Sequence, residues 1–473
     1  MLVTGAAGYI GGRLVPELLA RGYRVRVMVR GEPRPFLERW PGVEVAVADA
    51  LDLEGLSRAL EGVAVAYYLI HSLMQGPHEF ASTELQAAVN FREAAAANGL
   101  DRIIYLGGLG DTSAELSPHL RSRLEVAGEL KRGPVPVTIL RAAIVIGSGS
   151  APYEIMYHLV RRLPVLLIPH WGHHRCQPIA IRDVRKYLVG VLEVPATSGR
   201  DFDIGGPDVL TYREMLRILA RVLGERQIFL RSPFYHLTLS SYIAGLLTPV
   251  PAPLIKCLMG SLKNDVVCRD EEIREFLPFP PLGYREAIER AHDRENQDSI
   301  VTRWSDSYPP GHELALRLHE LDPAPQYLAE YALDTTKDAD RLFAALCRVG
   351  GKEGWFHSNW MWRLRGWVDR LLLGVGTLRG RRSSSTLRIG DALDFWRVED
   401  LQPGRRILLR AEMKMPGLAW LEFLLQDKGE KRELAVKAYF STQTLGGRLY
   451  WYCFLPFHHF IFVRLLQQIV KKA

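Results

Sequence analysis

Short apolar stretches alternate with helical patterns through the first part of the chain. Residues 1–4 (MLVT) predict a short buried strand, and residues 11–20 carry apolar side chains at helical spacing. Further strands are expected at residues 23–29, 43–48, 65–72, 101–110 and 137–150. Strands that alternate with helices are typical of a parallel sheet covered on both faces, so the pattern predicts a doubly wound α/β domain.

The pattern changes beyond residue 325. Stretches such as LRIGDALDFWRVEDL and RELAVKAYFST alternate with period two, and the chain ends in a helical pattern over residues 456–472. Antiparallel strands followed by one terminal helix predict an α+β domain in which a curved sheet grips the helix. Asp, Asn, Ser, Pro and Gly are frequent in residues 296–311, which is typical of a linker. We therefore expect a first domain over residues 1–300 with a small lobe at about 200–295, a linker over 301–324 and a second domain over 325–473.

Composition supports two ordinary folded domains. The chain has 473 residues, of which 48% are hydrophobic and 24% charged, and this length exceeds what one hydrophobic core supports. The net charge of +7 is spread along the sequence, which predicts weak affinity for anionic surfaces and argues against nucleic-acid binding. The five cysteines are far apart and form no Cys-x-x-Cys pair, so we expect free thiols, a reducing cytoplasm and no metal site.

Two apolar stretches bear on membrane association. Residues 232–255 carry no charge, but Pro249, Pro251, Pro253 and several polar side chains argue against a membrane span. A buried helix of the small lobe is the favoured interpretation, with a lid over a substrate pocket or an element resting on a membrane surface as alternatives. The terminal helix is expected to pack across the concave sheet, and interfacial membrane contact stays open. The sequence has no apolar stretch of 18 or more residues, so no membrane span is predicted. We therefore expect a cytoplasmic protein, with peripheral attachment to the inner face of the membrane as an alternative.

Three glycines, Gly5, Gly8 and Gly11, fall at the turn from the first strand to the first helix. Glycines at such a turn let the backbone approach a pyrophosphate, which the free N–H groups of the helix N-terminus bind; a glycine-rich turn without a ligand has the same pattern. The next strand ends at Arg30, where an arginine accommodates the 2′-phosphate of NADP, with a solvent-exposed strand end as the alternative. The third strand ends at Asp49, placed to meet the adenine edge. The sequence therefore predicts NADP as the cofactor.

With this turn the chain resembles the short-chain dehydrogenase/reductase superfamily, whose fingerprint Thr-Gly-x-x-Gly-x-x-Gly reads TGAAGYIG at residues 4–11. The run DIGGPDVLTYREML is similar to the extended and atypical branches, and the resemblance covers about the first 300 residues. It implies a Rossmann domain that binds NAD(P). The cofactor-binding positions that we assign are Thr4, Gly5, Ala7, Gly8, Tyr9, Ile10, Gly11, Arg30, Asp49, Ala50 and His71.

Different residues stand at the catalytic positions of the superfamily that the chain resembles. Active members use a tyrosine and, four residues on, a lysine, so that both lie on one helix face and the lysine depresses the tyrosine pKa. Here the corresponding helix, SPHLRSRLEVAGEL, places His119 and Arg123 at these positions, and the fifth strand ends in Leu106-Gly107-Gly108 without the expected serine. In one interpretation His119 is a general acid that titrates near neutral pH, while Arg123 orients the substrate or the nicotinamide ribose. In the other interpretation the chain no longer transfers hydride, and it binds the cofactor as a structural element or as a signal that it senses.

The second half resembles the helix-grip domain of polyketide cyclases and lipid-transfer proteins. It is also similar to the domain that follows an atypical reductase domain in a set of bacterial fusion proteins, in stretches such as GWFHSNWMWRLRGWVDRL and GRLYWYCFLPFHHFIF. This resemblance implies an apolar cavity able to hold a hydrophobic ligand. Residues 362–382 hold six arginines and one aspartate, which predict a buried network with Asp369, Asp391, Asp394 and Glu399, or a surface for an anionic lipid or a cofactor phosphate.

Together these features predict an NADP-dependent oxidoreductase that acts on a hydrophobic, lipid- or isoprenoid-like carbonyl or alkene. A cavity-forming domain fused behind the reductase favours chemistry, because a sensor has less need of one. The alternative is a non-catalytic NADP-binding sensor or assembly protein. The expected partner is a hydrophobic small-molecule substrate, whose identity the sequence leaves open together with the oligomeric state.

Overall fold

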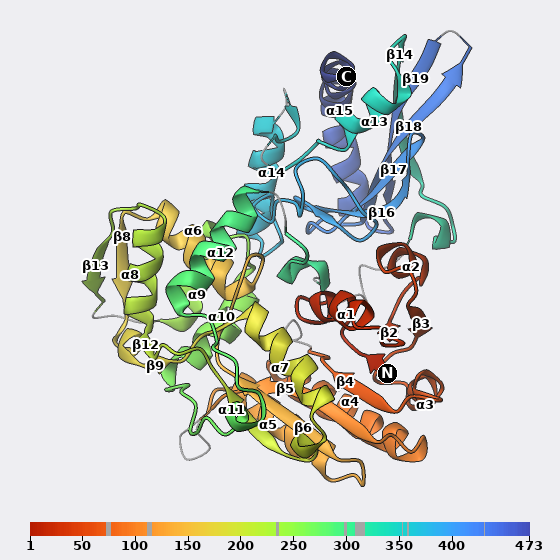
Figure 1. Ribbon diagram of the computed structural model, residues 1–473. Coiled ribbons are helices and arrows are strands. Elements are labelled where there is room, and N and C mark those ends of the chain that lie inside the picture. Colours follow the sequence, from red (N-terminus) through yellow and green to blue (C-terminus); the bar gives the residue numbers. More distant parts are fainter. Residues whose placement is uncertain are drawn as a thin grey trace. The chain divides into compact units, whose positions relative to one another are not determined.

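The computed structural model describes residues 1–71, 77–110, 116–232, 236–297, 300–307, 317–351, 353–356, 359–429 and 431–473. The chain forms two units (Figure 1). The first unit comprises Met1–Leu247 and Ala252–Tyr308, and the second comprises Thr248–Pro251 and Pro309–Ala473. Each unit has its own sheet and its own core.

A seven-stranded parallel sheet forms the centre of the first unit, in the order β11-β6-β5-β4-β1-β2-β3. Its strands are β1 (Leu2–Val3), β2 (Arg26–Val29), β3 (Glu44–Val47), β4 (Val65–Tyr68), β5 (Arg102–Gly108), β6 (Val137–Ala142) and β11 (Asp201–Ile204). The strand order reverses between β1 and β4, and dinucleotides bind at such a reversal, outside the carboxyl ends of the strands.

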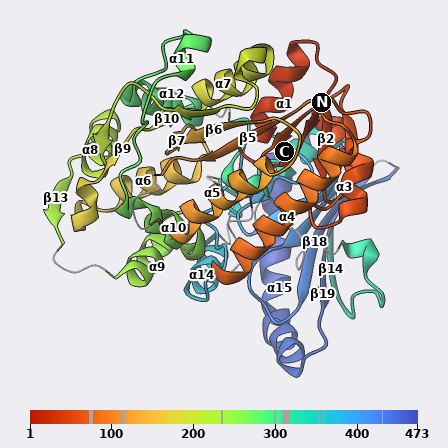
Figure 2. The same ribbon diagram turned by 90° about the horizontal axis from the view of Figure 1, so that it is seen from below.

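Helices cover both faces of this sheet, as the sequence pattern predicts. They are α1 (Gly11–Ala20), α2 (Arg34–Arg39), α3 (Leu53–Leu60), α4 (Pro77–Ala97), α5 (Pro118–Lys131), α7 (Ile181–Glu193) and α11 (Ile273–Phe276). Neighbouring strand residues enter opposite cores: Val3 packs with Leu14 of α1, whereas Leu2 packs with Leu56 of α3 and Phe91 of α4. Figure 2 shows α3, α4 and α5 along one face. The doubly wound α/β architecture is therefore confirmed.

The small lobe has a third core, built around Tyr153, Met215, Tyr284 and Ile288. Its strands pair as β7 (Val145–Ile146) with β10 (Ile179–Ala180), β8 (Val165–Ile168) with β13 (Ile228–Arg231), and β9 (Arg175–Cys176) with β12 (Leu210–Thr211). Its helices are α6 (Ala151–Arg162), α8 (Tyr212–Val222), α9 (Leu237–Leu247), α10 (Ala252–Gly260) and α12 (Tyr284–Asn296), with the 3₁₀ turns η1 (His170–His173) and η3 (Ser261–Lys263). The 3₁₀ turn η2 (Pro195–Thr197) lies against the parallel sheet instead, where the Thr197 hydroxyl accepts from Arg102 of β5 at 2.8 Å.

The uncharged stretch 232–255 contributes α9 and the beginning of α10. Ser241 and Ala244 on α9 are buried, but Leu239 and Ile243 on the same helix are 56% and 47% exposed. The favoured interpretation, a buried helix, is therefore correct for one face of α9, whereas the other face of this helix is exposed to solvent.

Residues 301–307 belong to the first unit, although the sequence assigns them to the linker. Thr302 is fully buried, and its hydroxyl accepts a hydrogen bond of 2.8 Å from Nε of Arg13. The backbone N–H of Trp304, at the start of η4 (Trp304–Ser307), donates to the carbonyl of Gly149 at 2.8 Å. The buried guanidinium of Arg13 needs the hydroxyl and the carbonyl of Thr302 as acceptors, so the expected linker starts too early.

The second unit contains a six-stranded antiparallel sheet in the order β14-β19-β18-β17-β16-β15. The strands are β14 (Tyr327–Thr335), β15 (Ala392–Leu393), β16 (Trp396–Gln402), β17 (Arg406–Ala411), β18 (Leu418–Lys428) and β19 (Lys431–Ser441). The helices are η5 (Leu318–Glu320), α13 (Ala339–Leu346), α14 (Asn359–Leu371) and α15 (Leu445–Lys472). An antiparallel sheet followed by one terminal helix is confirmed, whereas the likeness to helix-grip proteins and the apolar cavity stay predictions.

The terminal helix α15 begins eleven residues earlier than the sequence pattern predicts, at Leu445 rather than at residue 456. Thr444 caps it by accepting from the N–H of Gly447, and Pro456 lies inside the helix. The helix continues through the proline because its two halves are held on the sheet, where Trp451 stacks on Phe440 and Phe462 lies against Tyr331.

This longer helix also changes one expectation about membranes. Among the described residues, α15 is the one helix long and apolar enough to cross a bilayer by length and composition, with a mean hydropathy of 1.3 in a window of which 22% is buried. The sequence pattern predicts no segment with the length and apolar composition of a membrane span, and α15 is an exception. The helix predicted there begins at Pro456, which makes it too short to span.

Buried ion pairs hold the centre of the second sheet. Arg379 and Glu412 lie 2.6 Å apart with both side chains fully buried, and Arg397 binds the same carboxylate at 2.5 Å. Burial alone would raise the pKa of Glu412, but Arg397 and Arg379 outweigh it and lower the pKa. The network predicted from the sequence is confirmed at Arg382 and Asp391, which lie 2.9 Å apart.

The other predicted members of that network accept from different donors. Asp369 accepts from the backbone N–H of Gly376 at 2.8 Å, and Asp394 accepts from the indole of Trp355 at 2.9 Å. Glu399 accepts from the indole of Trp420 at 2.9 Å. These carboxylates are satisfied within the unit, as buried acceptors must be.

We expect Glu412→Gln to destabilise the second unit by about 3–5 kcal/mol, because it leaves buried arginines without their counter-charge. Asp427→Asn is the matched control on the same sheet, since Asp427 is 73% exposed and pairs only with Arg432 among the described residues. It should cost less than about 1 kcal/mol. Urea unfolding followed by circular dichroism measures both, and equal effects would contradict this account of the buried pair.

Candidate active site

The glycine turn after β1 is shaped by close backbone contacts. Gly5 has φ of +62°, and a Cβ added there would lie 2.4 Å from the carbonyl oxygen of Leu69. A Cβ added at Gly11 would lie 2.4 Å from the carbonyl oxygen of Gly5. Only glycine fits these two positions, so the backbone of the turn lies bare in front of α1. Ile10 at the N-cap makes no side-chain cap. The N–H groups of Gly12 and Arg13 donate to the carbonyls of Gly8 and Ile10 at 3.0 Å, so an anion at this end of α1 would meet the glycine turn and the positive end of the helix dipole.

Two predicted cofactor residues brace this turn through their side chains. The Thr4 hydroxyl donates to the carbonyl of Tyr67 and accepts from the N–H of Leu69, both at 3.0 Å, and Thr4 is fully buried. The guanidinium of Arg13 lies 4.6 Å from the ring centroid of Tyr9. The Thr4 and Tyr9 side chains therefore hold the turn in place, and contact with a cofactor would come from the backbone around them.

Three further predicted positions follow β2 and β3. Arg30 comes directly after β2 and is exposed, and within the described part of the chain no ion pair engages its guanidinium. The Asp49 carboxylate accepts from the N–H of Leu51 at 2.9 Å. The carbonyl of Ala50 accepts from the Asn90 amide at 3.2 Å. All three lie near the carboxyl ends of their strands, on the side where the glycine turn lies.

The structure brings His71, His119 and Arg123 together. His71 follows β4, and the other two lie one turn apart on α5. Nε2 of His119 is 3.3 Å from Nε2 of His71, and Nη1 of Arg123 is 3.3 Å from Nδ1 of His71. His71, assigned above to the cofactor, therefore belongs to the same cluster as the two proposed catalytic residues.

Residues outside the predicted set complete this cluster. Glu84 on α4 is 3% exposed, and its carboxylate lies 2.8 Å from Nδ1 of His71 and accepts from the Ser122 hydroxyl at 2.7 Å. Ser261 of η3 lies 3.3 Å from Nδ1 of His119 and 2.9 Å from the Ser117 hydroxyl. A continuous chain of hydrogen bonds thus runs from Glu84 through His71 and His119 to Ser261.

Arg123 is anchored to the end of β5. Its Nη2 donates to the carbonyl of Leu106 at 2.5 Å, and its guanidinium carbon lies 5.1 Å from the Tyr105 ring centroid. A Cβ added at Gly108 would lie 3.6 Å from Cγ of Arg123 and 3.2 Å from Leu120. The glycine at the place of the superfamily's serine therefore gives Arg123 room to reach the strand.

Both imidazoles of the cluster are neutral at pH 7. Burial lowers the pKa of His119 to about 3, and His71 and Arg123 add to the shift. Burial and Arg123 also lower the pKa of His71, against the opposing effect of Glu84. The expectation that His119 titrates near neutral pH is therefore wrong, because the sequence does not reveal that the ring lies beside a second histidine and an arginine.

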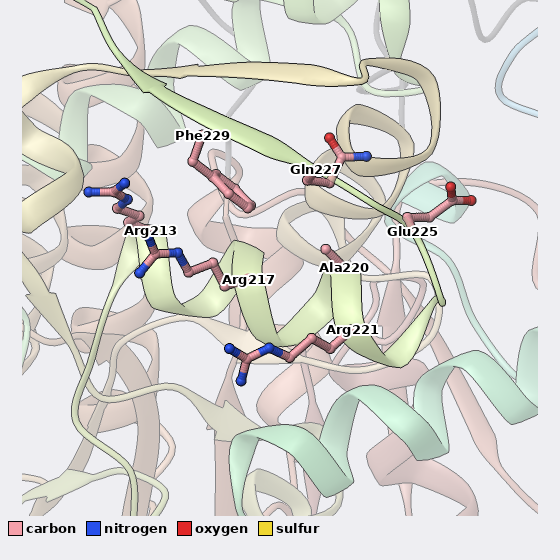
Figure 3. Close-up of a pocket in the computed structure, with 7 residues that line it drawn as sticks. All are labelled: Arg213, Arg217, Ala220, Arg221, Glu225, Gln227 and Phe229. Atoms are coloured by element: carbon pink, nitrogen blue, oxygen red, sulfur yellow. The ribbon is translucent and has the colours of Figure 1, made fainter.

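A separate cavity of about 320 Å³ lies in the small lobe, against α8 and β13 (Figure 3). Its lining is Arg213, Arg217, Ala220, Arg221, Glu225, Gln227 and Phe229. Three arginines at helical spacing make it strongly cationic, and none of the histidine-cluster or glycine-turn residues lines it. It takes no part in the chemistry considered below. Within the described ranges no three His, Cys, Asp or Glu side chains are grouped as metal ligands.

The NmrA-like family matches residues 1–242, which is more than half of the chain. The chain belongs to the NmrA-like family. This family is an atypical branch of the short-chain dehydrogenase/reductase superfamily, so the resemblance stated on the fingerprint is confirmed. A second family, described as protein of unknown function (DUF2867), matches residues 323–465 and covers most of the second unit.

Relatives of this NmrA-like protein include NAD(P)-dependent reductases with various substrates, which is consistent with the expected oxidoreductase. A ceramide reductase from Caulobacter vibrioides is 28% identical over 240 residues, which cover 49% of this chain and 73% of that protein. The photosystem II assembly factor Ycf39 from Trieres chinensis is 22% identical over 247 residues, which cover 52% of this chain and 76% of that protein.

A solved structure shows the same fold. Triphenylmethane reductase from Citrobacter sp., complexed with NADP(H), superposes with a TM-score of 0.51 at 18% identity. The match covers 61% of this NmrA-like chain and 99% of that one. The Rossmann assignment of the first unit is therefore supported by comparison as well as by strand order.

We expect Gly11→Ala to weaken NAD(P)H binding at least about tenfold and to destabilise the first unit by about 1–3 kcal/mol, because the new Cβ displaces the turn. Gly128→Ala on α5 is the matched control, since nothing lies within 4 Å of its added Cβ. It should leave binding unchanged and add up to about 1 kcal/mol of stability. Fluorescence titration with NADPH and urea unfolding measure both; unchanged affinity in the Gly11 variant would remove the turn from the cofactor site.

Proposed function

We propose that this chain is an NADP-dependent reductase of a hydrophobic carbonyl or alkene. The observation that carries the proposal is the hydrogen-bonded chain Glu84–His71–His119–Ser261. It stands where the superfamily has its proton donor, since His119 takes the tyrosine position and Arg123 the lysine position. The ceramide reductase relative supports a lipid-like substrate.

The cofactor site fits the dinucleotide by its shape and charge. The glycine turn between Gly5 and Gly11 lets a pyrophosphate approach the backbone at the positive end of α1. Arg30 would hold the 2′-phosphate, since it is a cation at the end of β2 that no described carboxylate neutralises. NADPH, when bound, supplies a hydride.

The chain's own residues would supply the proton that matches this hydride. The proposed relay requires a proton on the Glu84 carboxyl before the transfer, which then donates to Nδ1 of His71; Nε2 of His71 donates to Nε2 of His119, and Nδ1 of His119 donates to the Ser261 hydroxyl. When the substrate oxygen takes the Ser261 hydroxyl proton, every group passes one proton outward, and Glu84 ends as the carboxylate. Neither imidazole becomes an imidazolium before or after the transfer, which agrees with the lowered pKa of both rings.

Arg123 would orient this relay. Its guanidinium is fixed by the carbonyl of Leu106 and lies beside Nδ1 of His71, so a positive charge stands close to the position where Glu84 becomes negative. The charge favours the ionised product state of Glu84 and thereby favours release of the proton toward the substrate.

The second candidate is a non-catalytic assembly or sensing role. The relative named as a photosystem II assembly factor supports it. The two candidates differ in whether a hydride from the bound cofactor reaches another molecule.

The preference for NADP can be tested at Arg30. Arg30→Ala should weaken NADPH binding about tenfold or more and leave NADH binding unchanged, because only NADPH carries the 2′-phosphate. Arg58→Ala is the control, since Arg58 on α3 is 67% exposed and its ion pair with Glu54 is 3.9 Å long. Calorimetric titration with both nucleotides reports the result, and equal affinities of the wild type for NADPH and NADH would overturn the Arg30 assignment.

Hydride transfer can be tested with deuterated NADPH and a long-chain ceramide or a total lipid extract. We expect deuterium in a lipid product, and His119→Gln should slow labelling by about 10²-fold, the usual scale for a group that transfers a proton. The pH profile should lack the titration of a histidine near about pH 6.5, because both rings stay neutral, and the rate should fall with rising pH where Glu84 loses the proton that the relay needs.

The labelling experiment needs a folding control, and two of its outcomes would contradict the proposal. Ser241→Ala is the folding control, because the Ser241 hydroxyl is buried and donates to Thr238 within α9, away from the histidine cluster. Labelling at the wild-type rate in the His119 variant would place the proton donor elsewhere. No labelled product with tightly bound NADPH would favour the assembly or sensing role.

A further inference from the structure

Helix α14 of the second unit presents an apolar face to solvent. Five residues recur with helical periodicity on this face and are 63%, 54%, 57%, 45% and 37% exposed, in the order Trp360, Leu364, Trp367, Val368 and Leu371. The opposite side of the helix, with Trp362 and Asp369, is buried. Soluble proteins rarely leave a whole helix face of this composition open, so the face calls for an occupant.

Helix α15 presents a second apolar face next to the first. Leu445, Leu449, Tyr452, Phe457 and Phe460 are 81%, 66%, 62%, 50% and 43% exposed. Figures 1 and 2 both show α14 beside α15.

Contacts from Arg365 of α14 join the two helices. Its guanidinium carbon lies 5.2 Å from the ring of Tyr450 and 5.5 Å from the ring of Phe454 on α15. We call the exposed residues of both helices the α14–α15 face.

The exposed charges that α14 and α15 themselves carry have one sign. Helix α15 has no acidic residue, and the single acidic residue of α14, Asp369, is buried. Arg363 on α14 and Arg448 on α15 are exposed among the apolar side chains. Exposed tryptophan, phenylalanine and leucine with arginines at the margin are typical of helices that lie in the headgroup region of a membrane.

We propose that the α14–α15 face docks the second unit onto a phospholipid bilayer that contains anionic lipids. The helices lie in the plane of the interface, because Trp451 and Phe462 hold the other side of α15 on the sheet. Leu449 and Phe457 then reach into the acyl region, and Arg363 and Arg448 bind headgroup phosphates. This inference concerns where the protein works and holds whether or not the first unit transfers hydride.

Vesicle sedimentation tests the proposal with the full chain. The wild type should bind vesicles of phosphatidylcholine with phosphatidylglycerol more strongly than vesicles of phosphatidylcholine alone. Trp360→Ser with Leu364→Ser and Trp367→Ser should reduce the partition coefficient at least about tenfold, because the apolar contact is removed. The matched triple control is Val47→Ser, Leu167→Ser and Leu328→Ser, whose side chains are 57%, 63% and 53% exposed on strands elsewhere.

Contact with the acyl region has its own readout. Cys453 on α15 is exposed, whereas burial raises the pKa of Cys176, Cys257 and Cys268 to about 12 and that of Cys347 to about 11. A thiol-reactive, polarity-sensitive fluorophore therefore labels Cys453 selectively at neutral pH. Its emission should shift to shorter wavelength on anionic vesicles, and an alkaline carbonate wash should release the protein.

Several results would overturn the proposal. The first is that the wild type binds neither kind of vesicle. The second is that the Trp360 triple variant binds vesicles as strongly as the wild type does. The third is that the protein resists the carbonate wash, which would indicate that α15 spans the bilayer. A dimer in analytical ultracentrifugation that dissociates in the triple variant, without vesicle binding, would assign the face to a second copy of the chain. Normal hydride transfer in the triple variant would show that its loss of vesicle binding is separate from the chemistry of the first unit.

Discussion

The contact between Gly5 and the carbonyl of Leu69 sets the geometry on which the first unit depends. There is no space for a side chain between the end of β1 and the chain that leaves β4. Thr4 reinforces the contact by bonding to both Tyr67 and Leu69. Because His71 lies two residues beyond Leu69, this contact also fixes how far the histidine stands from the glycine turn. The site for the dinucleotide and the polar cluster are therefore positioned by one backbone approach.

In the proposed relay the polar cluster handles a proton without holding a charged ring. Burial and Arg123 disfavour an imidazolium on either histidine, so the relay assigns the change of charge to Glu84 at the far end. Its position on α4, on the opposite side of His71 from His119, separates the charged end of the chain from the end at Ser261. The small lobe completes the cluster through Ser261, so both parts of the first unit are needed for it.

The fold of the first unit could be predicted well because its signals are local. The fingerprint at residues 4–11 and the alternation of strands and helices each depend on near neighbours in the chain. His119 and Arg123 could be found by their position on a recognised helix. Glu84 had a usable signal, since it is a charge on the same helix face as Ala87, Ala88 and Phe91.

Long-range properties could not be predicted in the same way. Ser261 carries no signal, because it joins His119 from 142 residues away. The low pKa of His119 depends on burial and on neighbours brought by other elements, so no pattern in the sequence reveals it. The early start of α15 was missed because a proline usually ends a helix, and tertiary packing of Trp451 and Phe462 outweighs that rule here.

The bond between Arg13 and Thr302 joins residues 289 positions apart. During synthesis the first helix emerges early, and Nη2 of Arg13 can reach one acceptor, the carbonyl of Ser148, once that part of the chain is made. The acceptors for Nε and the second bond of Nη2 come only with Thr302. The first unit therefore completes the hydrogen bonds of this buried guanidinium only after residue 302 has been synthesised. A protein shortened at residue 300, where the strand and helix pattern ends, would leave Nε of Arg13 without its Thr302 acceptor. Fragments meant to hold the first unit should extend past Ser307.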